Sequence, residues 1–310
     1  MVSNKYNLPK PLFKALSVQR YPPIPQRISV THLIDSPLIR VLNMKHAHEI
    51  EEDASENLWA LLGKAIHYVV EKSGAADTSE VKMSYKHPSG ATLVTRGDYY
   101  DELTKTLIDW KCVSAYAYLL GGKKSWEKQL NVTRYVMKHG SEGKLDIQNL
   151  AVYAILRDWA LSKSYEHDYP NIPFQEVNLP VWDDDFLNGY VDTRVAMHLV
   201  AENYIDNINM IDTCSPEERW ERPTTYAFKK KDVKKAIRVL DTMDDILKYA
   251  QKQTKAKADS EQELIGVINK MGYEIEIRPG ASVKCESYCA VNKWCPWYIQ
   301  QHPPKSPALG

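Results

Sequence analysis

The segment Thr106–Lys111 most constrains the fold, because it is an apolar run of strand length that also carries an acid and a base. Asp109 and Lys111 stand two residues apart, and side chains at positions i and i+2 of a strand point to the same face of its sheet. A strand that only had to pack would have little reason to place both charges there. We therefore expect this strand to lie in a sheet beside a polar site.

The preceding segment Leu93–Asp98 predicts a second strand that forms a hairpin with the first. In an antiparallel pair, the numbers of opposed residues have a constant sum. If Glu102 faces Lys105 at the turn, Asp98 faces Asp109 at about 5 Å across the strands. The hairpin thus predicts two carboxylates side by side.

Two unpaired carboxylates at that distance repel each other and should not both ionise. A divalent cation would resolve the repulsion, and hard oxygen ligands suit Mg²⁺. Lys111, one pleat further along the same face, could then hold or deprotonate a water molecule. Asp101 is the rival for the first carboxylate, but in this register it faces Thr106 and points to the opposite side. The alternative is a surface ion pair in which Lys111 neutralises one acid.

A helix predicted over 53–72 supplies a third candidate ligand. Ser55 could cap this helix, and apolar residues follow at helical spacing. His67 lies one turn after Gly63, where the missing side chain allows close approach to a neighbouring backbone. An imidazole there could complete the shell of a metal, and Glu71, one turn further on, is a weaker candidate. The alternative is an ordinary surface or core histidine.

Strands and helices alternate along the chain, so the predicted fold class is α/β, with a central mixed sheet flanked by helices. Residues 1–28 carry several prolines and predict an extended arm, 29–302 a single domain with helical additions and a cysteine-bearing C-terminal segment, and 303–310 a flexible tail. Strands are expected over 81–85, 91–98, 106–111, 149–157, 177–181 and 273–278, and helices over 53–72, 114–120, 124–138, 183–207, 231–253 and 261–271.

The formal net charge is zero, so any nucleic-acid binding must come from a local basic patch. No stretch approaches the ~20 apolar residues of a membrane span, and the N-terminus lacks the apolar core of a secretory signal. Five cysteines without an export signal favour reduced thiols or a metal over disulfides. We expect a cytoplasmic protein that does not contact membranes.

Three short motifs together resemble the RecB-like branch of the PD-(D/E)XK nucleases, which includes phage exonucleases and CRISPR-associated adaptation nucleases. They are Gly63-x-x-x-His67, Gly97-Asp98 and the strand end Ile108-Asp-Trp-Lys111. The resemblance implies a restriction-endonuclease-like core and one or two Mg²⁺ or Mn²⁺ ions. It also implies catalytic roles for His67, Asp98, Asp109 and Lys111, with the Trp110 carbonyl as an extra metal ligand.

A fourth element of that family is a Gln-x-x-x-Tyr helix. Gln129 fits the glutamine, but Thr133 stands where tyrosine is expected, and Tyr135 lies too far around the helix to replace it. Gln129 would touch DNA or orient Lys111; the alternative is an ordinary exposed helix residue. The resemblance covers residues 29 to about 300, with its specific motifs within 63–133.

The C-terminal cysteines resemble the end of the iron–sulfur nucleases of this family, which hold a [4Fe–4S] cluster. Their spacing is Cys285-x3-Cys289-x5-Cys295 within 285–302, and the family's fourth cysteine near the N-terminus is absent. Cys214 or His302 could be the fourth ligand. A Cys₃His Zn²⁺ site is equally compatible, and three reduced thiols are the remaining alternative.

Basic and aromatic residues could contact nucleic acid, although such runs are usually solvated faces and core. The candidate phosphate contacts are Lys123, Lys124, Lys128, Lys229 and Lys230.

The sequence, with the resemblance, therefore predicts a metal-dependent DNA nuclease, an exonuclease of phage or recombination type. Its partner would be DNA, with a recombination or replication protein beside it, in the host cytoplasm if phage-encoded. The alternatives are a non-catalytic DNA-binding or assembly subunit on a nuclease scaffold, and a Cys₃His zinc protein that binds RNA.

Overall fold

The computed structural model describes residues 2–17, 21–73, 79–119, 124–140 and 145–303. It divides the chain into two compact units, one of Met1–Thr213 with Lys293–Gly310 and the other of Cys214–Asn292. The segment 29–302, which the sequence predicts as one domain, is therefore split. No described helix is both long enough and apolar enough to cross a bilayer.

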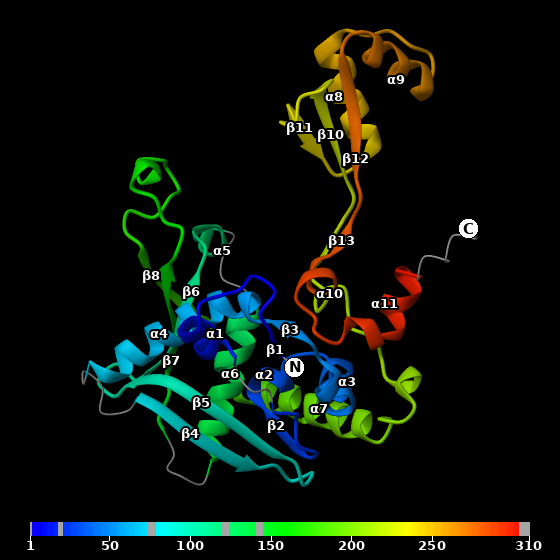
Figure 1. The fold of residues 1–310 in the computed structure, drawn as a ribbon. Coiled ribbons are helices and arrows are strands. Elements are labelled where there is room, and N and C mark those ends of the chain that lie inside the picture. The colour runs from blue at the N-terminus through cyan, green and yellow to red at the C-terminus, as the bar shows by residue number, and fades with distance from the viewer. Residues whose placement is uncertain (1, 18–20, 74–78, 120–123, 141–144, 304–310) are drawn as a thin grey trace. The chain divides into compact units, whose positions relative to one another are not determined.

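A mixed sheet forms the centre of the first unit (Figure 1). Its strands, in spatial order, are β2 (Arg27–Ser29), β5 (Thr92–Asp101), β6 (Thr106–Val113), β7 (Asn149–Leu156) and β8 (Phe174–Leu179), with β4 (Ser79–Lys86) also paired to β5. The pairs β2–β5 and β6–β7 are parallel, and the others are antiparallel. This arrangement confirms the predicted α/β fold with a central mixed sheet.

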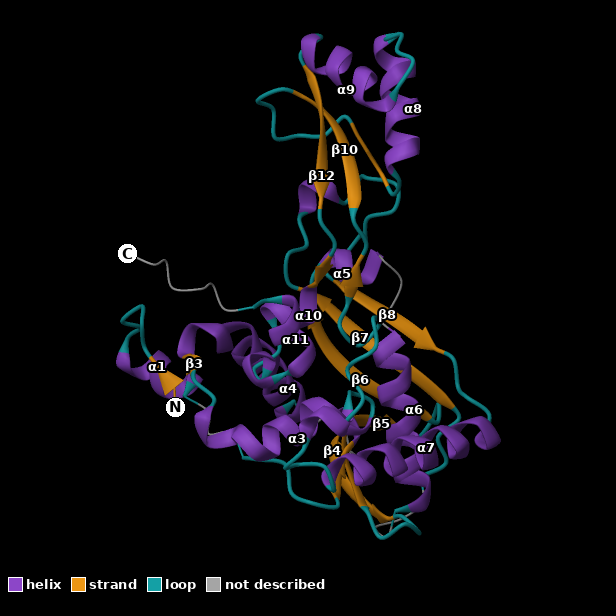
Figure 2. Cartoon of the chain, turned by 90° about the vertical axis from the view of Figure 1, so that its right-hand side faces the viewer, coloured by secondary structure: helices purple, strands orange, loops and turns teal. Residues whose placement is uncertain are grey.

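Helices flank the sheet (Figure 2). In the first unit they are α1 (Lys10–Leu16), α2 (Val30–Leu33), α3 (Pro37–His46), α4 (Leu58–Lys72), α5 (Ala115–Leu119), α6 (Lys124–His139), α7 (Asp184–Glu202) and α11 (Pro296–Gln301). Helices α5 and α6 lie close to their predicted bounds, α7 stops at Glu202 instead of residue 207, and α1, α2, α3 and α11 were not predicted.

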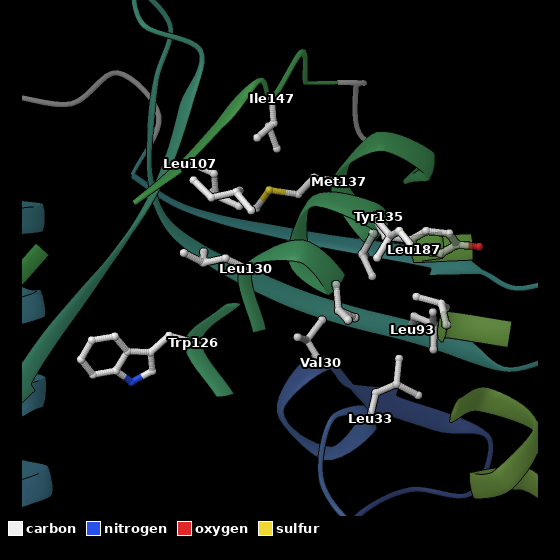
Figure 3. Close-up of a cluster of buried hydrophobic side chains, with 14 of the residues drawn as sticks. Val30, Leu33, Leu93, Leu107, Trp126, Leu130, Tyr135, Met137, Ile147 and Leu187 are labelled. Carbon is white, nitrogen blue, oxygen red and sulfur yellow. The ribbon is translucent and has the colours of Figure 1, made fainter. Parts of the chain in front are cut away.

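Helix α6 packs its apolar side onto the sheet and forms the main core (Figure 3). Trp126, Leu130 and Met137 of α6 are buried in one cluster with Leu107 of β6. A Cβ on Gly97 of β5 would overlap the terminal methyl group of Met137. Gly97 therefore lets α6 approach the sheet closely, beside the strand residues that carry the predicted site.

The N-terminal arm expected over 1–28 is structured in part. Its first residues, β1 (Val2–Ser3), pair in parallel with β3 (Glu52–Asp53), and its last residues belong to β2 of the central sheet. Between them, α1 has a proline in its first turn. The backbone N–H groups of a first turn have no acceptor within the helix, so the missing N–H of proline costs no hydrogen bond there. The prolines of this segment are therefore compatible with the start of a helix as well as with extended chain.

Helix α4 begins later than predicted. A short 3₁₀ turn (Ala54–Asn57) precedes it, and the cap of that turn is Asp53, not Ser55. Asp53 Oδ1 accepts hydrogen bonds from the Ser55 backbone N–H at 3.1 Å and from its hydroxyl at 2.7 Å. Ser55 is thus a donor to the capping carboxylate.

The second unit is a small α/β assembly. A three-stranded antiparallel sheet in the order β11 (Arg238–Leu240), β10 (Thr225–Lys230) and β12 (Tyr273–Arg278) packs against α8 (Met243–Thr254) and α9 (Glu261–Lys270). The remaining elements are β9 (Glu221–Arg222), β13 (Ala281–Ser282) and α10 (Val283–Ser287). Phe228, Ile246 and Ile268 are fully or almost fully buried in its core.

The long helix predicted over 231–253 is wrong for its first half. Asp232 has a positive φ of 61°, which interrupts a helix, and Val239 pairs with Ala227 as part of β11. The helix begins only at Met243, where the Thr242 hydroxyl accepts a hydrogen bond from a backbone N–H of the first turn. The charge pattern alone could not distinguish these two conformations.

Candidate active site

The β5–β6 hairpin has the predicted register. Tyr99 faces Ile108, Tyr100 faces Leu107 and Asp101 faces Thr106. Beyond these pairs the ladder stops, and Asp98 Oδ2 instead accepts a hydrogen bond from the Trp110 backbone N–H at 2.9 Å. The first acid is therefore held by the strand that carries the second.

The rival acid, Asp101, has a different task. Its Oδ1 accepts hydrogen bonds from the backbone N–H groups of Leu103 at 2.9 Å and Thr104 at 3.3 Å. These bonds close the loop between β5 and β6, which also contains Lys105 with a positive φ of 55°. Asp101 is a turn residue and does not take part in the site.

Asp109, Lys111 and Gln129 form one polar cluster between β6 and α6. Lys111 Nζ lies 2.8 Å from Asp109 Oδ2 and donates to Gln129 Oε1 at 3.2 Å. The other end of the amide, Gln129 Nε2, donates to Asp109 Oδ1 at 3.0 Å. Gln129 therefore fixes the acid and the base relative to each other.

Asp98 and His67 form the other side of the cluster. His67 Nδ1 of α4 lies 3.5 Å from Asp98 Oδ1, and both side chains are largely shielded. Burial, and next the negative charge of Asp109, raise the pKa of Asp98 to about 6, against the opposing effects of His67, the Trp110 N–H and Lys111. Burial and the neighbouring carboxylate therefore disfavour the charged form of Asp98 more than His67, the Trp110 N–H and Lys111 favour it.

The residues present fit a hydrated divalent cation. Asp109 Oδ2 is buried and, despite the nearby ammonium of Lys111, receives no well-aligned hydrogen bond from the described residues. No three described His, Cys, Asp or Glu side chains form a group that could hold a metal ion. Mg²⁺ commonly binds through one or two carboxylates and keeps several waters, so Asp98 and Asp109 would be its protein ligands.

Gly63 does not have the predicted close contact. A Cβ placed on it would meet no atom within 4 Å in the described part of the chain, its own helix backbone aside. The reason is that α4 has no buried residue, so its surface at Gly63 faces open space. The glycine whose contact does matter is Gly97, and sequence reasoning did not single it out for packing.

Thr133 and Tyr135 of α6 contact residues outside the cluster. Thr133 is 3% exposed and its hydroxyl lies 3.2 Å from that of Thr95. Tyr135 packs against Tyr85 and His139. Gln129 is thus the α6 residue of the Gln-x-x-x-Tyr comparison that reaches the acids.

A cavity of about 450 Å³ adjoins the cluster and was not predicted. Gln129 lines it, together with three cationic residues, Arg27, Lys82 and Arg96, and several hydroxyl residues, Ser29, Thr31, Ser84, Thr95 and Thr133. Cations and hydroxyl donors in one cavity suit a phosphate group. Only the pairing of β2 and β4 with β5 brings these residues together, so no local motif could have revealed the cavity.

The C-terminal cysteines divide between the two units. Cys214, Cys285 and Cys289 belong to the second unit, and Cys295 and His302 to the first. No disulfide joins any two of the five cysteines, all of which lie in the described ranges. Asn292 donates hydrogen bonds to the carbonyls of Cys285 at 2.8 Å and Cys289 at 3.3 Å. The metal predicted for these cysteines stays a prediction.

The candidate phosphate-binding lysines have different surroundings. Lys229 lies between Glu274 at 2.9 Å and Glu276 at 3.2 Å, and these hydrogen bonds raise its pKa. Lys124 and Lys230 are exposed, and Lys128 is half-buried. Lys123 lies outside the described residues. The two glutamates already neutralise Lys229, which makes it the least suited of the described four to bind a phosphate.

The fold and this cluster define the chain as a mixed α/β protein, consistent with a restriction-endonuclease-like fold, that carries two acids and a lysine on adjoining strands. No family model and no curated protein matches the sequence.

Three solved structures resemble the chain in part. The structure described as SSO0001 is 17% identical with a TM-score of 0.40, over 60% of this chain and 83% of that one. A phage-related exonuclease from Haemophilus somnus 129PT is 17% identical with a TM-score of 0.29, over 48% and 69%. LHK-Exo in complex with dAMP is 13% identical with a TM-score of 0.34, over 59% and 92%.

Proposed function

We propose that this chain is a divalent-metal-dependent DNA nuclease. One observation carries the proposal: Asp98 and Asp109 lie beside each other on paired strands, and Lys111, held by Gln129, lies against them. An ion pair that only stabilised the fold would need one acid, whereas here a second acid is kept in a half-buried site where burial and charge raise its pKa.

Each residue has a distinct role in this proposal. Asp98 and Asp109 would hold Mg²⁺ or Mn²⁺, with the Trp110 carbonyl as a further ligand; His67, which contacts Asp98 in the structure, would have to move to join them. The ion would neutralise charge on the scissile phosphate. Lys111 would orient a water molecule as the ammonium, or take its proton as the neutral amine, and the amide of Gln129 holds the Lys111 side chain beside Asp109. Attack on phosphorus would leave a 5′-phosphate.

The cavity beside Gln129 supports binding of a DNA phosphate next to the cluster, and the family resemblance is our reason for proposing an exonuclease. Its three cations and its hydroxyl groups suit one phosphate of a DNA strand, and its volume of about 450 Å³ is that of a small-ligand site. A phosphate held there would lie beside Gln129, which contacts both Asp109 and Lys111.

One observation favours a second candidate, a non-catalytic DNA-binding or assembly subunit. Lys111 is already 2.8 Å from Asp109, which is also the geometry of a purely structural ion pair. A protein of this kind would bind DNA and degrade none.

Degradation of linear, circular and single-stranded DNA with Mg²⁺ or Mn²⁺ separates the two candidates. Lys111→Ala and Asp109→Asn should each remove metal-dependent degradation, because each deletes one member of the cluster. Asp101→Asn is the matched control, since Asp101 is an acid of the same hairpin that only closes the turn. Full metal-dependent degradation by either cluster variant would contradict the nuclease proposal.

A second metal belongs to this proposal as well. We propose a [4Fe–4S] cluster or Zn²⁺ at Cys285, Cys289 and Cys295, with Cys214 or His302 as fourth ligand, in a structural role. The supporting observation is the spacing of three thiols within eleven residues.

A further inference from the structure

We propose that α4 and α5, which both contact cations of the segment 157–163, form a stacking surface for unpaired bases, so that the substrate strand reaches the active site in single-stranded form. The stacking surface consists of Trp59, Gly63 and Tyr116, with the cations Arg157 and Lys163. This inference rests on the proposed nuclease function and names its substrate class.

The stacking surface leads directly to the cluster. Trp59, Gly63 and His67 follow each other at intervals of four residues on α4, so each is displaced by only about 40° around the helix from the one before. Trp59 and His67 are separated by about 12 Å along the helix axis. Because His67 contacts Asp98, one helix face connects Trp59 with the acids.

Helix α4 leaves apolar side chains in solvent. It is rich in apolar residues, yet none of its fifteen residues is buried. Trp59 is 64% exposed and Leu62 39%. A helix that is apolar over much of its surface normally lies in a core or at a binding site.

Gly63 keeps the path over this helix open. A Cβ at this position would touch no atom within 4 Å in the described part of the chain, other than the backbone of α4 itself. Glycine within a helix lowers stability relative to alanine, and no packing contact explains it here. A strand that passes from Trp59 to His67 would cross this position, where a side chain would stand in its way.

A cationic side chain lies over each of the two exposed aromatic rings of the stacking surface. The Arg157 guanidinium lies 4.6 Å from the centre of the Trp59 ring, and Lys163 Nζ lies 6.0 Å from that of Tyr116, which is 63% exposed. Both cations come from the segment that follows β7, and α5 follows β6, the strand of Lys111.

This chemistry selects the ligand. Aromatic rings stack on the faces of unpaired bases, and adjacent cations contact the phosphates between them. In a duplex the base faces are covered by neighbouring bases, so exposed rings have little to contact. We therefore assign the surface to single-stranded DNA.

Binding in EDTA tests the assignment without any cleavage. Fluorescence anisotropy compares a labelled single-stranded oligonucleotide with the duplex of the same sequence. Trp59→Ala and Tyr116→Ala should each weaken single-strand binding by about ten-fold, with little effect on duplex binding. The control is Trp220→Ala, because Trp220 of the second unit is also exposed, at 46%, and also lies near a lysine, with Lys284 Nζ 5.9 Å from its ring centre.

A second pair of variants tests the path across α4. Gly63→Leu should stabilise the helix but weaken single-strand binding, because its side chain fills the path. Gly189→Leu is the matched control: Gly189 lies inside α7 and also has open space around its Cβ. It should raise stability similarly and leave binding unchanged.

The outcomes separate this inference from the nuclease proposal. Wild-type affinity in Trp59→Ala and Gly63→Leu, or equal losses for single strand and duplex, would overturn the stacking surface even if Lys111 proves essential for cleavage. Loss of binding in both variants, but not in the two controls, supports the surface even if no cleavage is found.

Discussion

Asp98 and Trp110 are joined by a hydrogen bond at the point where the β5–β6 ladder ends, from the Trp110 backbone N–H to Asp98 Oδ2 at 2.9 Å. The bond replaces a ladder hydrogen bond with a contact to a carboxylate. It holds Asp98 beside Asp109 although the two acids repel each other, and burial of the pair raises the pKa of Asp98. The hairpin therefore works against electrostatic repulsion to keep both acids in place.

Gln129 should act as a positioning residue. Gln129→Ala removes the amide that joins Lys111 to Asp109, so we expect a rate loss on the order of ten-fold or more with the fold intact. The sensitive measurement is the separation of kcat from KM, because a displaced Lys111 slows the chemical step without weakening DNA binding. Ser125→Ala, at an exposed position one turn earlier in α6, should leave both constants unchanged; a change there would show that α6 itself had moved.

His198 should make stability depend on pH. It is fully buried, and burial, followed by the charges of Arg194 and Arg40, lowers its pKa to about 3, against a hydrogen bond to the Leu33 carbonyl. Between about pH 6.5 and 3 the unfolded chain binds a proton that the folded chain does not. Stability is therefore lost as pH falls through this window, by up to about 1.4 kcal/mol per unit.

Urea unfolding at several pH values measures this loss. The variant His198→Gln cannot titrate, so the difference between its slope and that of the wild type isolates the histidine from other groups, including His32 beside it. Parallel slopes for the two proteins would contradict the prediction.

The buried ion pair between Arg40 and Glu202 should contribute to the stability of the first unit. Arg40 is 1% exposed, its Nη1 lies 2.5 Å from Glu202 Oε1, and its Nη2 donates to the carbonyls of Ile24 and Arg27. Arg40→Met leaves the carboxylate of Glu202 without its cation, and we expect a loss of about 3–5 kcal/mol in the free energy of unfolding.

The double variant Arg40→Met with Glu202→Leu provides the control. Because it removes both charges, part of the stability should return. A double variant as unstable as Arg40→Met would show that packing around Arg40, and not the unpaired charge, causes the loss.

Gly97→Ala should strain the contact between β5 and α6. The new methyl group would overlap the end of the Met137 side chain and lie 3.4 Å from Leu107. Met137 can rotate in part, so we expect a loss of about 1–3 kcal/mol in thermal or urea unfolding. Adding Met137→Ala should cost less in the Gly97→Ala background than in the wild type. Additive losses would mean that the two residues do not interact.

The cysteine segment has a direct spectroscopic test. Protein purified without oxygen should show a broad visible absorption band if it holds an iron–sulfur cluster, and no such band but one equivalent of zinc by metal analysis if it holds Zn²⁺. Cys289→Ser should reduce the amount of either metal. A colourless protein without bound zinc would contradict the proposed metal site.

The hairpin register could be predicted because it follows from residue numbers once the loop length is fixed, and it alone distinguishes Asp98 from Asp101. Capping was harder: Asp53 and Ser55 are both good caps in sequence, and only the fold shows which one accepts. The helix predicted over 231–253 failed because an amphipathic basic pattern also fits a turn followed by β11.

The cavity lay beyond sequence reasoning for a different reason. Arg27, Lys82 and Arg96 belong to three strands, and each is an ordinary surface cation in its own segment. They share one cavity only because β5 pairs with β2 along one edge and with β4 along the other. Long-range pairing of this kind leaves no local pattern.

The short pair β9–β13 gives the second unit an unusual independence. Glu221 pairs with Ser282 and Arg222 with Ala281, so the chain enters and leaves the three-stranded sheet of this unit at neighbouring points. An insertion whose two ends meet can be removed, lengthened or exchanged without pulling on the chain that receives it. Residues 223–280 are therefore a natural place for cutting and grafting: replacement by a short glycine-containing turn should leave the central sheet and its acidic cluster able to fold.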